Sequence, residues 1–158
     1  AMGMNTLGVR ARPQPTAHVD EVHGIAELAG LWSRADYIVC CVPRLDSTRG
    51  LIGAGAFAAM KPTAVLIDVS RGGVVDEAAL VAVLEAGRIK GAALDVFATE
   101  PLPANHPLWG YDNVIVTPHC SSVLAGWETK SVRMFAENLA RYRRGEPLKN
   151  VVDPARGY

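Results

Sequence analysis

Four short apolar runs, each rich in strand-forming residues and each followed by a proline or a loop, constrain the fold most strongly. They are YIVCCV at 37–42, AVLIDV at 64–69, AALDV at 92–96 and NVIVT at 113–117. Strands that are apolar on both sides are typical of a parallel sheet with both faces covered. Helical segments separate the runs, so the sequence predicts an α/β fold in which helices cover both faces of a parallel sheet.

The expected helices cover residues 25–35, 55–60, 77–86 and a long last segment from Ser121 or Ser122 to Arg144. Asp76 is a suitable N-cap for the third helix, and Gly87 ends it. In the last helix, apolar residues three or four apart form one face; they are Val132, Phe135, Leu139 and Tyr142. Residues 7–9 are expected to form a short strand near the start of the sequence, followed by a proline-containing loop at 10–16.

The composition is that of an ordinary globular domain. The 158 residues include 16 Lys+Arg and 16 Asp+Glu, for a formal net charge of zero, and 49% of the residues are hydrophobic. Such a chain is not disordered, and it lacks the positive charge of a broad nucleic-acid surface. No apolar run approaches the roughly 18 residues of a membrane span, and the three cysteines are too few for a disulfide framework. A cytoplasmic protein with no nucleic-acid or membrane partner is therefore expected.

Three chemically active side chains follow three different apolar runs. Arg71 lies in the SRGG loop after 64–69, Glu100 follows 92–96, and His119 follows 113–117. Ligands of open parallel sheets bind at the carboxyl ends of the strands, so the three side chains are expected at one edge. Each has an ordinary structural explanation when taken singly. Together, an arginine, a carboxylate and an imidazole can bind a carboxylate and transfer a proton, which predicts an active site.

Long motifs in a fixed order resemble the D-isomer-specific 2-hydroxyacid dehydrogenases. They are KPTAVLIDVSRGGVVDEAAL, GRIKGAALDVFATEPLP and NHPLWGYDNVIVTPH, and the similarity extends from about Leu7 to Asp153. The helix after His119 is most similar to the glyoxylate and hydroxypyruvate reductase branch. The resemblance implies a Rossmann-type coenzyme domain, NAD(P)-dependent reduction of a small 2-oxo acid to a D-2-hydroxy acid, and a homodimer.

The resemblance also implies a role for each matching residue. Arg71 would hold the carboxylate and carbonyl oxygen of the substrate, His119 would protonate that oxygen, and Glu100 would pair with His119. A carboxylate beside an imidazole favours the imidazolium form, which keeps the acid charged near neutral pH. Asp95 would contact the nicotinamide amide. The implied coenzyme-contacting residues in this part of the chain are Val42, Pro43, Ser70, Arg71, Asp95 and His119.

The end of the strand at 7–9 favours NADP(H) over NAD(H). Discrimination for NAD uses an acidic residue at this strand end, whereas cations accommodate the 2′-phosphate of NADP. Here the residues are Arg10 and Arg12, and the first acidic residue is Asp20. The alternative is that Arg10 and Arg12 are two solvated loop arginines.

Five positions, at three places in the sequence, depart from the family pattern. Asp68 stands where the family usually has Asn, Arg44-Leu45 replaces a common Leu-Thr, and Cys120-Ser121 replaces a common apolar–small pair. These departures leave the three catalytic positions intact and affect details of substrate and coenzyme binding. The remaining histidines have no ligand-like spacing, so no metal site is expected.

The first strand of the family and its G-x-G-x-x-G loop have no counterpart in the sequence. Residues 53–58 fit the looser G-x-G-x-x-A form, but only Leu51-Ile52 precede them as a strand and no acidic residue follows at the required distance. A helix with Phe57 and Met60 buried is expected there instead. In the strand order 3-2-1-4-5-6 the first strand is central, so its absence predicts a gap in the sheet.

The expected domain organisation follows from this gap. Residues 1–150 are expected to form a partial NAD(P)-binding domain and 151–158 a C-terminal tail, with the glycine-rich loop and the substrate domain absent. Alone, such a chain is expected to bind dinucleotide weakly and to be inactive. A second hypothesis is a non-catalytic binding or regulatory protein, because the family includes transcriptional corepressors that use this scaffold. The retained Arg71, Glu100 and His119 favour an enzyme.

Overall fold

The computed structural model describes residues 3–155. The chain divides into two compact units, Ala1–Pro118 and His119–Tyr158, and each unit is described by itself. The first unit holds all the strands of the described residues and the short helices between them. The second holds one long helix and the segments on either side of it.

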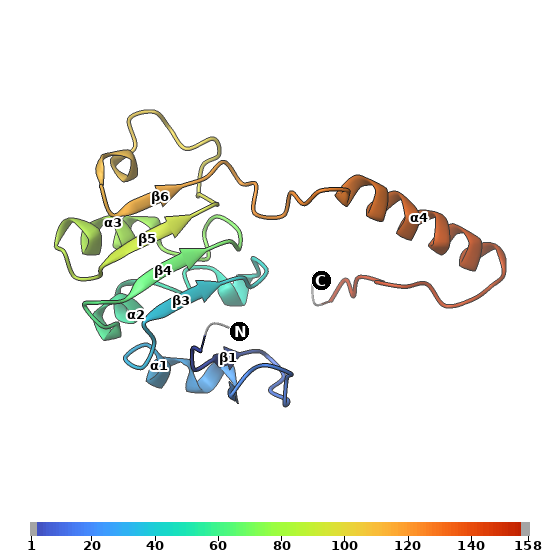
Figure 1. Ribbon diagram of the computed structural model, residues 1–158, viewed down its shortest axis with the longest axis horizontal. Coiled ribbons are helices and arrows are strands. Elements are labelled where there is room, and N and C mark those ends of the chain that lie inside the picture. Colours follow the sequence, from blue (N-terminus) through green and yellow to red (C-terminus); the bar gives the residue numbers. More distant parts are fainter. Residues whose placement is uncertain (1–2, 156–158) are drawn as a thin grey trace. The chain divides into compact units, whose positions relative to one another are not determined.

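A four-stranded parallel sheet forms the centre of the first unit (Figure 1). Its strands lie in the order β3-β4-β5-β6 and have the bounds Tyr37–Cys40, Val65–Asp68, Gly91–Leu94 and Val114–Val116. The four apolar runs of the sequence therefore supply these four strands. The expected α/β fold with a parallel sheet is confirmed, although β3 ends at Cys40 rather than at residue 42.

Two helices pack their apolar residues against one face of this sheet. They are α2, Ala54–Ala59, and α3, Glu77–Glu85. Phe57 of α2 and Leu80 of α3 are each 1% exposed and share a core with Ile38 and Leu66 of the sheet. The expectation of a helix rather than a nucleotide loop at residues 53–58 is therefore confirmed.

The opposite face of the sheet carries apolar side chains that remain accessible within the described residues. Val39, Ile67, Ala93 and Ile115 lie in one register row across the four strands. Val39 is 57% exposed and Ile115 is 65% exposed, whereas the residues on the first face are buried. The helices of the first unit therefore bury one face of the sheet much more completely than the other.

The helices begin and end where local chemistry allows. Asp76 caps α3 as expected, because its side chain accepts a hydrogen bond from the Ala79 N–H at 3.1 Å. The helix expected over 25–35 is shorter, with a 3-10 turn at Ile25–Glu27 followed by α1 at Leu28–Leu31. Two further 3-10 turns occupy Asp46–Thr48 and Pro107–Gly110.

A second, two-stranded sheet lies at the start of the chain. Its strands are β1, Leu7–Val9, and β2, Glu21–His23, and they run parallel. The first was expected, whereas β2 was missed because its three residues include a single aliphatic side chain. Asp20 links the two strands, since its carboxylate accepts hydrogen bonds from the Thr6 N–H at 2.7 Å and the Thr6 hydroxyl at 2.8 Å.

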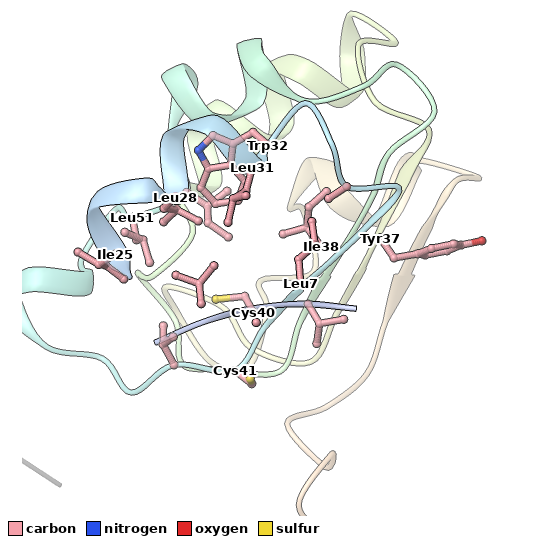
Figure 2. A pocket seen from close by; sticks show the side chains of 16 residues that line it. Leu7, Ile25, Leu28, Leu31, Trp32, Tyr37, Ile38, Cys40, Cys41 and Leu51 are labelled. Carbon is pink, nitrogen blue, oxygen red and sulfur yellow. The ribbon is translucent and has the colours of Figure 1, made fainter. Parts of the chain in front are cut away.

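An apolar cleft of about 290 Å³ lies between this small sheet and β3 (Figure 2). Leu7 of β1, Leu28 and Leu31 of α1, and Ile38 and Cys40 of β3 line it. The strands β1 and β3 are not paired with each other. The expected gap in the sheet is therefore confirmed.

The second unit contains α4, Trp127–Arg143, which begins later than the expected Ser121 or Ser122. Gly126 precedes it with φ 75°, a left-handed conformation that separates the helix from the turns before it. The apolar face of α4 is accessible, with Phe135 69% exposed. Asn138 pairs with the backbone of Lys149 through two hydrogen bonds of 2.9 and 3.0 Å. Within residues 3–155, no helix has the length and apolar character required to cross a bilayer.

Candidate active site

The carboxyl ends of β3, β4, β5 and β6 lie at one edge of the sheet, because all four strands are parallel. The segments after these strands carry residues of the expected site. Val42 and Pro43 follow β3, Ser70 and Arg71 follow β4, and Asp95 directly follows β5. The topology therefore brings residues far apart in sequence to one edge.

A close approach at Gly72 holds the loop after β4 against the segment after β5. A side-chain carbon placed on Gly72 would lie 1.7 Å from the Phe97 carbonyl oxygen and 2.4 Å from its carbonyl carbon. Only glycine allows the two backbones to lie this close. The loop that carries Arg71 is therefore packed directly against the backbone three residues before Glu100.

Glu100 is anchored within its own segment. Its Oε1 accepts a hydrogen bond from the Phe97 N–H at 3.0 Å. On the neighbouring loop, Arg71 donates from Nη1 to the Ser70 carbonyl oxygen at 2.7 Å, and its side chain is exposed. The structure thus brings the backbone segments that carry Arg71 and Glu100 together, with the guanidinium accessible to an anionic ligand.

Two buried carboxyl groups lie beneath these loops. Asp68 is 2% exposed, and its Oδ1 accepts hydrogen bonds from the Ser70 N–H at 3.0 Å and the Ser70 hydroxyl at 2.5 Å. Burial raises the pKa of Asp68 above its ordinary value, although the bonds from Ser70 act in the opposite direction. Asp95 is 3% exposed, and its Oδ1 accepts a hydrogen bond from the Thr117 hydroxyl at 2.5 Å.

A further carboxylate connects α3 to the segment that carries Glu100. Glu77, the first residue of α3, accepts a hydrogen bond from the Ala98 N–H at 3.1 Å. Its other oxygen lies 3.1 Å from His106 Nε2, and His106 accepts at Nδ1 from the Leu108 N–H at 3.3 Å. These contacts hold both ends of the segment between Phe97 and Leu108.

His119 is the first residue of the second unit and is joined directly to Pro118 after β6. Its φ of 53° lies in the left-handed region, which non-glycine residues occupy at a cost of roughly 1–3 kcal/mol. Backbone strain of this kind is concentrated at functional sites. The pairing of His119 with Glu100 stays a prediction.

Arg10 and Arg12 lie where the coenzyme preference was predicted to be decided. Arg10 directly follows β1, and its backbone N–H donates to the His23 carbonyl oxygen at 3.1 Å. Its guanidinium donates to the Thr16 hydroxyl at 3.3 Å, and both arginines are exposed. Their positive charge is therefore available at the carboxyl end of β1.

Sequence reasoning missed several contacts that build this edge. The Asp68–Ser70 pair had a signal, because Asp commonly accepts a hydrogen bond from the N–H two residues later. The close approach at Gly72 had a weaker sequence signal, namely a Gly-Gly pair beside an arginine. The bonds of Thr117 to Asp95 and of Glu77 to Ala98 join distant residues, so no local pattern reports them.

Comparisons with known proteins identify the family and support the fold. Residues 1–121 match the profile described as D-isomer specific 2-hydroxyacid dehydrogenase, NAD binding domain. The D-isomer specific 2-hydroxyacid dehydrogenase of Xanthobacter autotrophicus, solved with NADPH and MES, is 42% identical with a TM-score of 0.91; the match covers 99% of this chain and 64% of that one.

Two further proteins show the breadth of the similarity. The NADPH-dependent glyoxylate/hydroxypyruvate reductase of Sinorhizobium meliloti, solved with NADP and sulfate, is 32% identical with a TM-score of 0.91, over 99% of this chain and 50% of that one. A D-3-phosphoglycerate dehydrogenase of Methanocaldococcus jannaschii is 38% identical over 154 residues, which are 97% of this chain and 29% of that protein.

This chain therefore spans between 29% and 64% of the length of these three proteins. The profile match and the two structural matches agree with the motifs and with the parallel sheet. The chain belongs to the D-isomer-specific 2-hydroxyacid dehydrogenases, and its first 121 residues match the NAD-binding domain of that family.

Proposed function

We propose that the full-length protein reduces a small 2-oxo acid, such as glyoxylate or hydroxypyruvate, to the D-2-hydroxy acid with NADP(H). The observation that carries this proposal is the packing of the Arg71 loop against the Glu100 segment through Gly72. It places an accessible guanidinium and an anchored carboxylate at the carboxyl edge of the sheet. The substrate domain would come from the part of the protein outside this chain, and we propose a cytoplasmic homodimer.

Each of the three catalytic residues has a task that its chemistry supports. The Arg71 guanidinium forms paired hydrogen bonds with the substrate carboxylate and orients the carbonyl group. His119 donates a proton to the carbonyl oxygen and takes it back in the reverse direction. Glu100 would pair with His119 and orient its imidazole ring. When bound, the coenzyme supplies the hydride that reduces the carbonyl carbon.

The described residues fit the two ends of a dinucleotide. Buried Asp95 and Ser70 lie at the carboxyl ends of β5 and β4, where Asp95 would hold the carboxamide of the nicotinamide. Val42 and Pro43, after β3, would line the cleft, and Ser70, Arg71 and His119 would lie near the nicotinamide. Arg10 and Arg12 would bind a 2′-phosphate through charge-assisted hydrogen bonds.

Steady-state kinetics of the full-length protein test the proposal. Glyoxylate and hydroxypyruvate are assayed in the reductive direction with NADPH and with NADH, and D-3-phosphoglycerate in the oxidative direction. Turnover of glyoxylate or hydroxypyruvate with a higher kcat/KM for NADPH is expected. Turnover of D-3-phosphoglycerate alone would contradict the proposed substrate. Coenzyme binding without any turnover would favour a regulatory protein.

A charge substitution tests the coenzyme preference. The variant with both Arg10→Gln and Arg12→Gln is expected to raise the KM for NADPH by about 10-fold or more, because two charge-assisted bonds are lost. The KM for NADH is expected to change little. Arg88→Gln is the matched control, since this exposed arginine precedes β5 and lies at the opposite edge of the sheet. Equal effects on NADPH and NADH would contradict the assignment.

A further inference from the structure

The buried carboxyl of Asp68 is not used by any step of the proposed reaction, yet it is linked to Arg71. Its Oδ1 accepts hydrogen bonds from both the backbone N–H and the hydroxyl of Ser70. The carbonyl oxygen of Ser70 in turn accepts the bond from Arg71 Nη1. A continuous set of hydrogen bonds therefore runs from the interior of the sheet to the accessible guanidinium.

We propose that Asp68 is a positioning residue: by holding Ser70, its carboxylate sets the direction in which Arg71 presents its guanidinium to a substrate carboxylate. The part of this proposal that concerns substrate rests on the proposed function. Asp68 acts through Ser70 and contacts neither substrate nor coenzyme.

The charge of Asp68 distinguishes it from the asparagine that the family pattern usually has at this position. Asparagine offers the same oxygen acceptor without a charge. Hydrogen bonds to an ionised acceptor are roughly twice as strong as neutral ones, so the carboxylate holds Ser70 more firmly. The opposing cost is the burial of a charge, which disfavours the ionised form.

Other titratable and charged groups surround Asp68 on each element packed against it. Cys40 of β3 contacts its carboxyl, and burial raises the pKa of the Cys40 thiol, so the thiol stays protonated near neutral pH. Asp95, after β5, donates its backbone N–H to the Asp68 carbonyl oxygen at 3.0 Å. Glu77 of α3 lines the same small cavity as Asp68. Arg71 lies in the loop that follows β4.

Protonation of Asp68 has opposite effects on positioning and on stability. Burial raises the pKa of Asp68, so its carboxylate becomes neutral at a higher pH than an exposed one. As the pH falls through that pKa, the two bonds from Ser70 lose their charge assistance. The folded state also binds this proton more tightly than the unfolded state, so the stability contribution of Asp68 is present at low pH and is lost as the pH rises.

Nuclear magnetic resonance of this chain tests the positioning role with the Asp68→Asn variant. In the unmodified chain, the Ser70 amide and the Arg71 Nε–H signals are expected to titrate together with the Asp68 carboxyl carbon, at a higher pH than an exposed aspartate because burial raises the pKa of Asp68. In Asp68→Asn this titration is expected to be lost. Asp76→Asn is the matched control, because it makes the same change at an exposed helix cap and is expected to leave both signals unaffected.

The stability of the Asp68→Asn variant distinguishes a positioning role of Asp68 from a merely structural role. Asp68→Asn is expected to unfold at a higher urea concentration than the unmodified chain at pH 7, and the gain is expected to shrink as the pH falls. In the full-length enzyme it is expected to raise the KM for glyoxylate roughly fivefold, with kcat changed less than twofold. A more stable variant with weaker substrate binding is the signature of positioning by a buried charge.

The outcomes distinguish this inference from the proposed function. Ser70 and Arg71 signals that do not follow Asp68 would overturn the positioning role. Coupled signals in a full-length protein that reduces no 2-oxo acid would refute the proposed function and leave the link from Asp68 to Arg71 established. An active enzyme whose KM is unchanged in Asp68→Asn would overturn the inferred effect on substrate.

Discussion

Replacing Gly72 with alanine is expected to lower the free energy of unfolding of this chain by about 3 kcal/mol. The added methyl group would lie 1.7 Å from the Phe97 carbonyl oxygen, so one of the two backbone segments must move. No flexible side chain is available to give way, since the nearest atoms all belong to the Phe97 and Ala98 backbone. Equilibrium urea denaturation of the native and variant chains measures the difference.

Gly55→Ala is the matched control for this substitution. Gly55 lies within α2, and an added methyl group there would meet nothing within 4 Å. Alanine favours the helix over glycine, so this variant is expected to gain roughly 0.5–1 kcal/mol. If Gly72→Ala proved as stable as the unmodified chain, the Arg71 loop and the Glu100 segment would not be held together as described. In the full-length enzyme, Gly72→Ala is also expected to reduce kcat/KM, because Arg71 would be displaced.

Replacing His119 with glutamine in the full-length protein is expected to lower kcat by about 100-fold to 10,000-fold, the usual contribution of a general acid. Glutamine retains hydrogen-bonding capacity and similar size but cannot transfer the proton. The KM for the 2-oxo acid is expected to change much less, because we propose that Arg71 supplies the main contact with the substrate carboxylate. Initial rates with hydroxypyruvate and saturating NADPH measure both quantities.

His18→Gln is the control for the effect of the left-handed backbone conformation at His119. His18 also has a positive φ, 64°, so the same substitution carries a comparable conformational cost at both positions. It lies in an exposed turn outside the candidate site and is expected to leave turnover unchanged. Normal turnover in His119→Gln would remove this residue from the mechanism. Loss of turnover in both variants would indicate destabilisation instead of lost acid catalysis.

The sheet was largely predictable because its strands are short, continuous apolar runs with clear ends. The positions of β3, β4, β5 and β6 all follow from such runs. The strand at Glu21–His23 was not predictable in the same way, since it is stabilised by pairing with β1 rather than by an apolar pattern. The start of α4 was placed too early, because serine resembles an N-cap and the left-handed turn at Gly126 has only a local glycine as its signal.

Candidate catalytic residues could be proposed from the sequence, whereas the contacts that hold their segments in place could not. Arg71, Glu100 and His119 could be selected because each follows a separate apolar run and matches a long motif. The hydrogen bond from Thr117 to Asp95 joins residues on different strand ends, and it depends on the packing of the whole sheet. A sequence shows which side chains are available, whereas such long-range contacts exist only after the strands have aligned.

The parallel connectivity of the sheet also determines when its strands can pair as the chain is synthesised. Tyr37 of β3 pairs with Val65 of β4, and Val65 pairs with Gly91 of β5. In each of these two pairs a helix, α2 or α3, lies between the two strands in the sequence. At about 5–20 residues per second, β3 waits roughly one to six seconds on the ribosome before β4 has been made. During that interval the Tyr37–Cys40 segment lacks its partner strand β4. The pairing of β3 with β4 is therefore delayed by a period that translation speed sets.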